Sequence, residues 1–140
     1  MARRQVAAAR GGTLVLDADG MTKAAAHDQR AQAFLTAALR RQARVMVSAI
    51  TLAEVLRGTA RDAPTHHLLR RLVLVPVTEQ IGRMAGGLLG AAGVPGSATI
   101  DAVVAATALT APGPVVLLTS DPTDLTRLTN SRTDLKVATV

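Results

Sequence analysis

The sequence has no cysteine and almost no aromatic side chains: its 140 residues include one Phe and no Trp or Tyr. Without cysteine the chain can form no disulfide, no zinc site with cysteine ligands and no thiol nucleophile, so any metal must be bound by oxygen or imidazole ligands. Without aromatic platforms it cannot stack bases as RNA recognition motifs and oligonucleotide-binding barrels do. These classes of binding and catalysis are therefore excluded.

Long hydrophobic runs are also missing. No uninterrupted apolar stretch reaches the roughly 18 residues that a transmembrane helix needs, and the basic residues 1–12 lack the apolar segment of a secretion signal. Together with the absence of cysteine, this predicts a cytoplasmic protein that does not bind membranes. Because 49% of the residues are hydrophobic, we expect a single folded domain over residues 13–140, after a short basic lead-in over residues 1–12.

Negative charge is scarce. The chain has ten acidic residues against sixteen Lys and Arg residues, which gives a net charge of +6. This excess favours a polyanionic partner such as RNA, because Arg and Lys can contact its phosphates. The same excess arises where a GC-rich genome encodes most basic positions as Arg. Composition alone leaves both interpretations open.

Short apolar segments alternate with helical patterns along the chain, which predicts a parallel sheet with helices on both faces. The strands are expected over residues 13–16, 45–47, 72–77, 115–119 and 136–140. Helices are expected over residues 18–26, 28–44, 79–92, 99–111 and 121–128, and the last three have Thr78, Thr99 and Asp121 as their caps. A further helix is expected to begin at a cap at Ser48 or Thr51 and to end at Arg57. A short helix is expected after a cap at Thr65. In such sheets ligands bind beyond the carboxyl ends of the strands.

Six of the ten acidic residues lie at the ends of predicted elements or on apolar faces rather than on solvated helix faces. They are Asp17, Asp19, Glu54, Asp101, Asp121 and Asp124. Carboxylates that converge on one edge repel each other by roughly 4 kcal/mol per close pair at an effective dielectric constant near 20. The usual compensation in a cysteine-free site is a hard divalent ion, Mg²⁺ or Mn²⁺. Beside a basic surface, such an ion predicts nuclease chemistry.

Four segments in this order resemble the PIN-domain ribonucleases, particularly VapC-like toxins. They are Leu-Val-Leu-Asp over 14–17, Ser-Ala-Ile-Thr-Leu-Ala-Glu-Val-Leu-Arg-Gly over 48–58, Thr-Ile-Asp-Ala-Val-Val-Ala-Ala over 99–106, and Leu-Thr-Ser-Asp-Pro-Thr-Asp-Leu over 118–125. The resemblance implies a single-domain, flavodoxin-like α/β/α sandwich with a five-stranded parallel sheet in the order 3-2-1-4-5. It also implies metal-dependent endoribonuclease activity, a small antitoxin protein as partner, and a homodimer.

The resemblance also assigns roles to individual residues. Asp17, Glu54, Asp101 and Asp121 would form the catalytic metal site, with Asp124 in its outer shell. Thr119 or Ser120 would hydrogen-bond a carboxylate or the substrate phosphate, and Asp19 replaces a small hydroxyl residue common in the family, which leaves its role open. Three arginines are candidate contacts to RNA phosphates: Arg57, Arg61 and Arg127.

Each acidic residue also has a purely structural interpretation. Asp17 and Asp121 could be helix N-caps, Asp101 an acid favoured in a first helical turn, and Glu54 an ion-pair partner of Arg57 or Arg61. The three histidines, His27, His66 and His67, lack the spacing of metal ligands and are expected at the surface.

Two other functions compete with the nuclease. The segments Asp17-Ala18-Asp19-Gly20 and 120–124 also resemble motifs of haloacid-dehalogenase-like phosphohydrolases, although no Lys lies between Lys23 and Lys136 to serve that chemistry. The second alternative is a catalytically inactive PIN fold that binds RNA or a protein. Repelling carboxylates in a binding groove argue against it.

Overall fold

The computed structural model describes residues 11–140, so the predicted lead-in falls outside the described residues except for Gly11 and Gly12. Five strands form one fully parallel sheet in the order β3-β2-β1-β4-β5. The strands are β1 (Thr13–Leu16), β2 (Arg44–Ser48), β3 (Val73–Val75), β4 (Val115–Thr119) and β5 (Leu135–Thr139). The predicted fold class and strand order are therefore confirmed.

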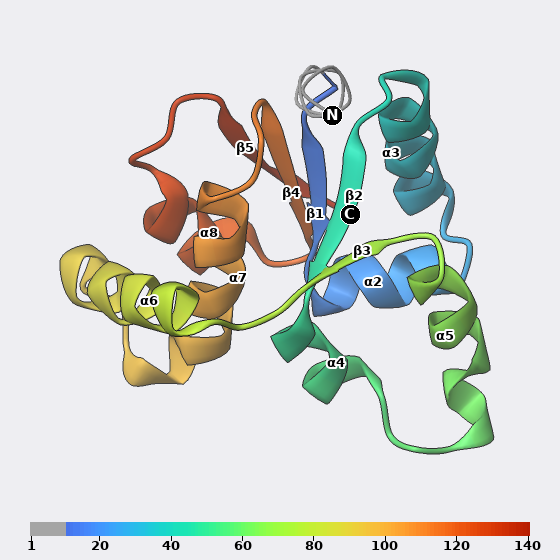
Figure 1. The fold of residues 1–140 in the computed structure, drawn as a ribbon, viewed down its shortest axis with the longest axis horizontal. Helices are drawn as coiled ribbons and strands as arrows, with labels where there is room; N and C mark the ends of the chain where they lie inside the picture. The colour runs from blue at the N-terminus through green and yellow to red at the C-terminus, as the bar shows by residue number, and fades with distance from the viewer. Residues whose placement is uncertain (1–10) are drawn as a thin grey trace.

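Helices cover both faces of this sheet (Figure 1). One face carries α2 (Ala18–Ala25), α3 (Gln29–Arg40) and α5 (Ala63–Leu69), and the other carries α6 (Glu79–Ala92), α7 (Thr99–Leu109) and α8 (Pro122–Thr129). The short helix α4 (Ala49–Val55) lies beyond the end of β2, and two 3-10 turns, η1 (Ala60–Asp62) and η2 (Gly96–Ala98), precede α5 and α7. No helix within residues 11–140 has the length and apolar character to cross a membrane.

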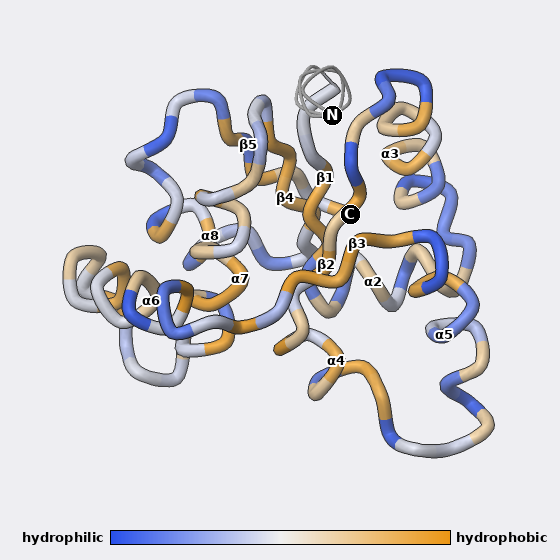
Figure 2. Tube along the Cα trace, viewed as in Figure 1, coloured by the Kyte–Doolittle hydropathy of each residue, from blue (hydrophilic) through white to orange (hydrophobic). Residues whose placement is uncertain are grey.

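Two hydrophobic cores, one on each face, hold the layers together. Along β1, Leu14 and Leu16 face one core and Val15 faces the other, as the two-residue period of a strand requires. The helix α7 is buried along most of its length, which explains its alanine-rich sequence, because small side chains let a helix lie close to a sheet. Hydrophobic colours run along the strands in Figure 2, whereas the loops at both ends of α3 are hydrophilic.

Most predicted helix boundaries hold to within a few residues, but two caps are wrong. The helix predicted to start at Thr65 begins at Ala63, because Asp62 takes the N-cap position and Pro64 lies in the first turn, where its missing N–H costs nothing. Thr99 is the first residue of α7 and not its cap, since its hydroxyl donates to the Gly96 carbonyl of η2, 2.6 Å away. Ser48, Thr78 and Asp121 cap their helices as predicted.

Two further lengths differ from the prediction. Helix α3 ends at Arg40 and β2 begins at Arg44, because the turn between them places Gln42 at a φ of 57°, a left-handed conformation that no helix continues through. The edge strand β3 spans only three residues.

Candidate active site

The central strands β1 and β4 end side by side and bring two predicted site residues to the same edge. Leu16 pairs with Leu118, so that the residues after them, Asp17 and Thr119, also lie next to each other. The Asp17 N–H donates to the Leu118 carbonyl at 3.2 Å. Gly20 allows this close approach, because a Cβ there would lie 2.7 Å from the Leu118 oxygen. The start of α2 is thereby held against the end of β4.

Asp17 has a structural role in addition to its place among the acids. The residue is buried, with 8% of its surface exposed. One carboxylate oxygen accepts the Gly20 N–H at 2.8 Å and caps α2, so the structural interpretation as an N-cap is right. Burial raises the pKa of Asp17 above its ordinary value of 3.8, although hydrogen bonds from the Gly20 N–H and the Thr119 hydroxyl oppose the shift. The cap uses one of the two carboxylate oxygens.

Two helices supply further acids to this edge. Glu54 lies on α4 and Asp101 in the first turn of α7, and these helices contact each other. Burial, followed by the charges of Asp101 and Asp17, raises the pKa of Glu54. The predicted ion pair of Glu54 with an arginine is not formed, because the Arg57 guanidinium donates to the Ala53 and Leu56 carbonyls instead.

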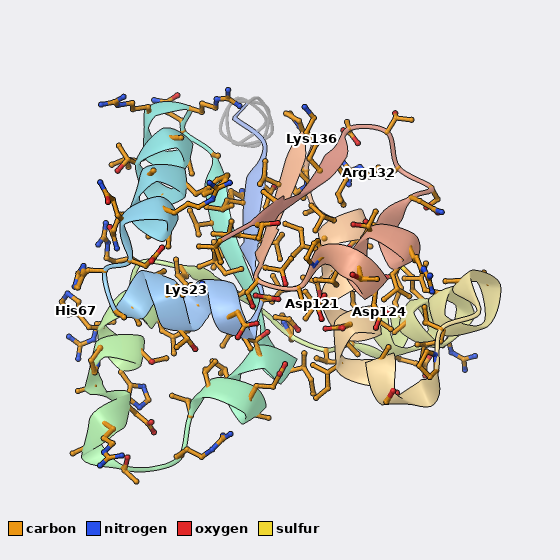
Figure 3. All side chains as sticks on the ribbon, turned by 180° about the vertical axis from the view of Figure 1, so that it is seen from behind. Lys23, His67, Asp121, Asp124, Arg132 and Lys136 are labelled. Atoms are coloured by element: carbon orange, nitrogen blue, oxygen red, sulfur yellow. The ribbon has the colours of Figure 1, made fainter. Side chains whose placement is uncertain are left out.

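Four of the other acids influence the pKa of Asp101. Burial raises its pKa first, and then the charges of the surrounding acids, in the order Asp17, Asp124, Asp121 and Asp19, raise it further. Asp121 caps α8 through a 3.4 Å contact with the Thr123 N–H, and Asp124 lies one turn along the same helix. We call the six residues Asp17, Asp19, Glu54, Asp101, Asp121 and Asp124 the acidic edge. Figure 3 shows Asp121 and Asp124 close to the point where the strands end.

Among residues 11–140, no positive side chain forms an ion pair with the acidic edge. The two ion pairs within residues 11–140 are Arg83–Glu79 on α6 and Arg132–Asp134 before β5, and neither involves one of the six acids. Lys23, on α2, donates to the Val140 carbonyl at 3.0 Å. The carboxylates therefore repel one another without a protein cation between them, and this repulsion is the physical cause of part of the raised pKa values.

The donor set of the acidic edge fits a hard divalent ion. It offers only oxygen ligands, carried by separate elements, which is the chemistry that Mg²⁺ and Mn²⁺ prefer. In the side-chain positions described, however, no three acidic or histidine residues are close enough to hold one ion together. Binding an ion would require the carboxylates to move closer to one another, and none of them is held in an ion pair that would oppose this.

The hydroxyl residues after β4 contact carboxylates. Thr119 is buried, and its hydroxyl donates to the Asp121 carbonyl at 3.3 Å and accepts the Asp121 N–H at 3.1 Å. Ser120 donates to a carboxylate oxygen of Asp19. Asp19, whose role the sequence leaves open, is thus tied to the end of β4 while its side chain stays exposed.

The three candidate arginines do not form one patch. Arg57 and Arg61 lie together in the loop between α4 and α5, and they line a groove next to α2. Arg127 lies apart from them, exposed on the last turn of α8.

Two residues that the sequence analysis did not assign to the site, Asp62 and Thr51, have buried polar side chains. Asp62 is 6% exposed and accepts the backbone N–H groups of Arg57 and Gly58. Its place four residues after a glycine and two before a proline is the only signal in the sequence. Thr51, one turn before Glu54 on α4, is fully buried, and its hydroxyl has no partner among the described residues.

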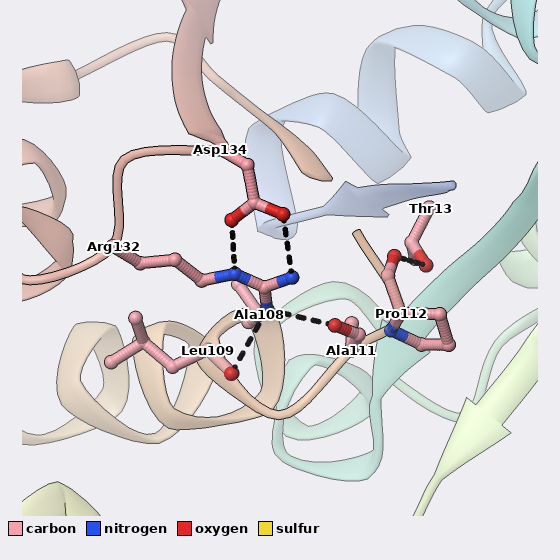
Figure 4. Close-up of polar contacts among 7 residues, drawn as sticks. All are labelled: Thr13, Ala108, Leu109, Ala111, Pro112, Arg132 and Asp134. Carbon is pink, nitrogen blue, oxygen red and sulfur yellow. Dashed lines mark hydrogen bonds and ion pairs between the residues drawn. The ribbon is translucent and has the colours of Figure 1, made fainter. Parts of the chain in front are cut away.

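The opposite edge of the sheet contains an apolar pocket of about 380 Å³, lined by residues such as Phe34, Ala38 and Val116. One charged pair beside it is satisfied within the protein. Arg132 pairs with Asp134 at 2.5 Å and donates to the carbonyls of Leu109 and Ala111 at the end of α7 (Figure 4). The six acids of the acidic edge lack an ion pair with another described residue and lie at the other end of the strands, and the acidic edge is therefore the candidate site.

Comparison with known proteins places the chain in a family. A family model of the PIN domain matches residues 14–128, a range that includes all six residues of the acidic edge. No curated protein sequence gives a significant match.

Solved structures share the fold at low sequence identity. VapBC2 from Rickettsia felis, bound to a DNA fragment from its promoter, matches with a TM-score of 0.68 and 16% identity over 91% of this chain and 98% of that chain. VapBC-1 from nontypeable Haemophilus influenzae matches with a TM-score of 0.64 and 23% identity over 91% and 97%. FitAB bound to the IR36 DNA fragment matches with a TM-score of 0.64 and 21% identity over 90% and 94%.

Proposed function

The chain belongs to the PIN-domain family, and from that membership we propose that it is a metal-dependent endoribonuclease, the toxin of a toxin–antitoxin pair. The observation that carries this proposal is the acidic edge, where carboxylates from several elements influence one another's pKa values and form no ion pair with a residue of the described part of the chain. Such an arrangement destabilises the fold at neutral pH. A site that keeps this unfavourable charge is the expected one for binding a divalent ion and acting on a phosphodiester.

Asp17, Glu54, Asp101 and Asp121 would hold the ion, with Asp124 in the outer shell. Bound there, Mg²⁺ or Mn²⁺ would activate a water molecule and stabilise the charge that develops on the phosphate and on the leaving oxygen. The protein's own groups orient three of the carboxylates. The Gly20 N–H orients Asp17, Ser120 orients Asp19, and the cap of α8 orients Asp121.

The proposed partners follow from the family and its structural neighbours. The similar structures are of VapBC and FitAB toxin–antitoxin proteins, which supports a small antitoxin protein as the partner of this chain. RNA as substrate, a homodimer, a cytoplasmic location and a nuclease domain over residues 13–140 complete the proposal. The net charge of +6 favours RNA as the substrate. The phosphates of RNA are repelled by the acidic edge, and an overall positive charge offsets this repulsion as the RNA approaches.

The decisive experiment measures RNA cleavage with a matched pair of substitutions. Glu54→Gln and Glu79→Gln each remove one negative charge from a helix, but Glu79 is an exposed partner of Arg83 on α6. We expect cleavage with Mg²⁺ or Mn²⁺, its loss with EDTA, its loss in Glu54→Gln, and full activity in Glu79→Gln. Undiminished cleavage by metal-stripped protein in EDTA would refute the mechanism. RNA binding without any cleavage would instead favour the inactive binding module.

The phosphohydrolase alternative is tested by Asp19. As the second acid of the phosphatase motif it would be as essential as Asp17, whereas in a nuclease it is an exposed residue bonded to Ser120. We expect Asp19→Asn to reduce RNA cleavage less than Asp17→Asn does. Equal losses, together with hydrolysis of a phosphomonoester, would favour the phosphohydrolase. Neither lysine is placed for that chemistry, because Lys23 donates to Val140 and Lys136 lies near the start of β5.

A further inference from the structure

A groove of about 520 Å³ lies between α2 and the loop that joins α4 to α5, and we call it the basic groove. One wall is α2, represented by Thr22 and Ala26, and the other is the loop with Arg57, Thr59 and Arg61. Both walls include or adjoin helices that carry residues of the acidic edge. Helix α2 starts at its cap Asp17, and α4 carries Glu54 directly before Val55, which lines the groove.

The loop that forms the second wall is held in one shape by Asp62. The Asp62 carboxylate accepts the Gly58 N–H at 2.8 Å and the Arg57 N–H at 3.0 Å. Gly58 has a φ of +74°, which favours glycine, so the turn also depends on this residue. Asp62 is the one acidic residue among the described residues that line the groove. The groove has an excess of positive charge, because two arginines, Arg57 and Arg61, line it against this one carboxylate.

The two arginines of the groove differ in what they already bind. The Arg57 guanidinium donates to the Leu56 carbonyl at 2.7 Å and to the Ala53 carbonyl at 3.2 Å, so it completes the end of α4. The Arg61 guanidinium has no hydrogen bond or ion pair with any residue in the described part of the chain, although its side chain is exposed beside the hydroxyl of Thr59. Arg61 can therefore offer its full set of donors to a ligand.

We propose that the basic groove binds a backbone phosphate of the same RNA strand whose scissile phosphate lies at the acidic edge, with Arg61 as its main ligand. The proposal rests on the proposed function and adds to it the position of the strand. A guanidinium binds phosphate through two parallel hydrogen bonds, and threonine hydroxyls add further donors. Helix α2 has eight residues and is about 12 Å long, which exceeds the spacing of neighbouring phosphates, so a phosphate further along the same strand can contact the groove. An acidic peptide would satisfy the same arginine, but nothing extends such a peptide to the acidic edge.

The test measures binding of an RNA oligonucleotide to the catalytically inactive Asp101→Asn protein at several salt concentrations. In this background Arg61→Ala is compared with Arg83→Ala, which removes the same charge from α6, on the other face of the sheet (Figure 1). We expect Arg61→Ala to raise Kd at least about tenfold at the lowest salt concentration. It should also lower the slope of log K against log salt by about one. Arg83→Ala should change neither quantity, and Arg61→Lys should restore part of the affinity but not the bidentate contact.

Three results would overturn the inference. Equal effects of Arg61→Ala and Arg83→Ala would show that only net charge matters. An unchanged Kd and slope in Arg61→Ala would show that the groove does not contact RNA. Competition by polyglutamate as effective as that by RNA would identify a general anion or protein surface. Since binding is measured without cleavage, a chain that cleaves RNA but shows any of these results would keep the proposed function and lose only the basic groove.

Discussion

The two ends of the parallel strands differ in how their charged side chains are paired. At the end where the strands begin, which we call the amino edge, Arg132 lies against Asp134, and its guanidinium also donates to carbonyl groups at the end of α7 (Figure 4). This contact lowers the pKa of Asp134. The end where the strands stop is the carboxyl edge, and it contains the acidic edge. At the carboxyl edge, burial and then the charges of neighbouring acids raise the pKa values of Glu54 and Asp101. One edge is arranged for stability, and the other keeps unfavourable charge, as expected where a ligand supplies the missing cation.

The strongest test of this contrast removes one acid from each edge. Asp101→Asn should reduce RNA cleavage by more than about 100-fold, the upper range found for changes that only support a metal site, while thermal stability stays equal or rises because a repulsion is lost. Asp134→Asn should do the reverse, with normal cleavage and a lower melting temperature. Cleavage assays and thermal unfolding of both variants provide the measurement. Substantial cleavage by Asp101→Asn would mean that the acidic edge is not the active site.

Addition of a divalent ion should stabilise the protein through the acidic edge alone. At an ion concentration one hundred times Kd, binding to the folded state adds about 2.7 kcal/mol to the free energy of unfolding. We expect Mg²⁺ or Mn²⁺ to raise the melting temperature of the wild-type protein and of Asp134→Asn. The ion should have little effect on a protein carrying Asp17→Asn and Asp101→Asn. An equal response of all three proteins would place the ion elsewhere.

At the amino edge, Arg132→Ala should cost about 1–2 kcal/mol of stability, because carbonyls at the end of α7 lose their donors. Cleavage should be unchanged at temperatures where the variant is folded. Chemical denaturation measures the first effect and the RNA assay the second. The exposed Arg83→Ala on α6 is the control, since its ion pair is solvated and should contribute little. A loss of cleavage in Arg132→Ala would connect the two edges through α7.

The sequence predicts the layers and the location of the acids, because alternating strands and helices place strand ends at one edge, whereas the strand order comes from the resemblance to the PIN family. It does not predict how single side chains are used. Asp17 and Asp121 are helix caps and also members of the acidic edge, so the two interpretations are compatible. The alternative ion pair of Glu54 with Arg57 is not formed, because Arg57 donates to backbone carbonyls whose position depends on where α4 ends. Asp62 is missed since its partners are backbone N–H groups of a loop whose shape has no periodic pattern.

The smallest expected effect, and the one that compares both edges in a single measurement, is the pH dependence of stability in EDTA. The pKa of Asp101 is raised above 3.8, so its folded form binds the proton more tightly than its unfolded form, and the ionised carboxylate destabilises the fold above the raised pKa. The stability gain of Asp101→Asn should therefore be largest at pH 7 and should disappear as the pH falls through the raised pKa towards 3.8.

The pKa of Asp134 is lowered below 3.8, so its ionised form stabilises the fold at higher pH, and this contribution is lost only as the pH falls through the lowered value. The stability deficit of Asp134→Asn should accordingly persist down to about pH 4 and close below it. Thermal unfolding of wild type and both variants from pH 7 to pH 3 checks the order of the two transitions. Differences of the same sign in both variants at pH 7 would show that the two edges do not differ in the way their pKa shifts indicate.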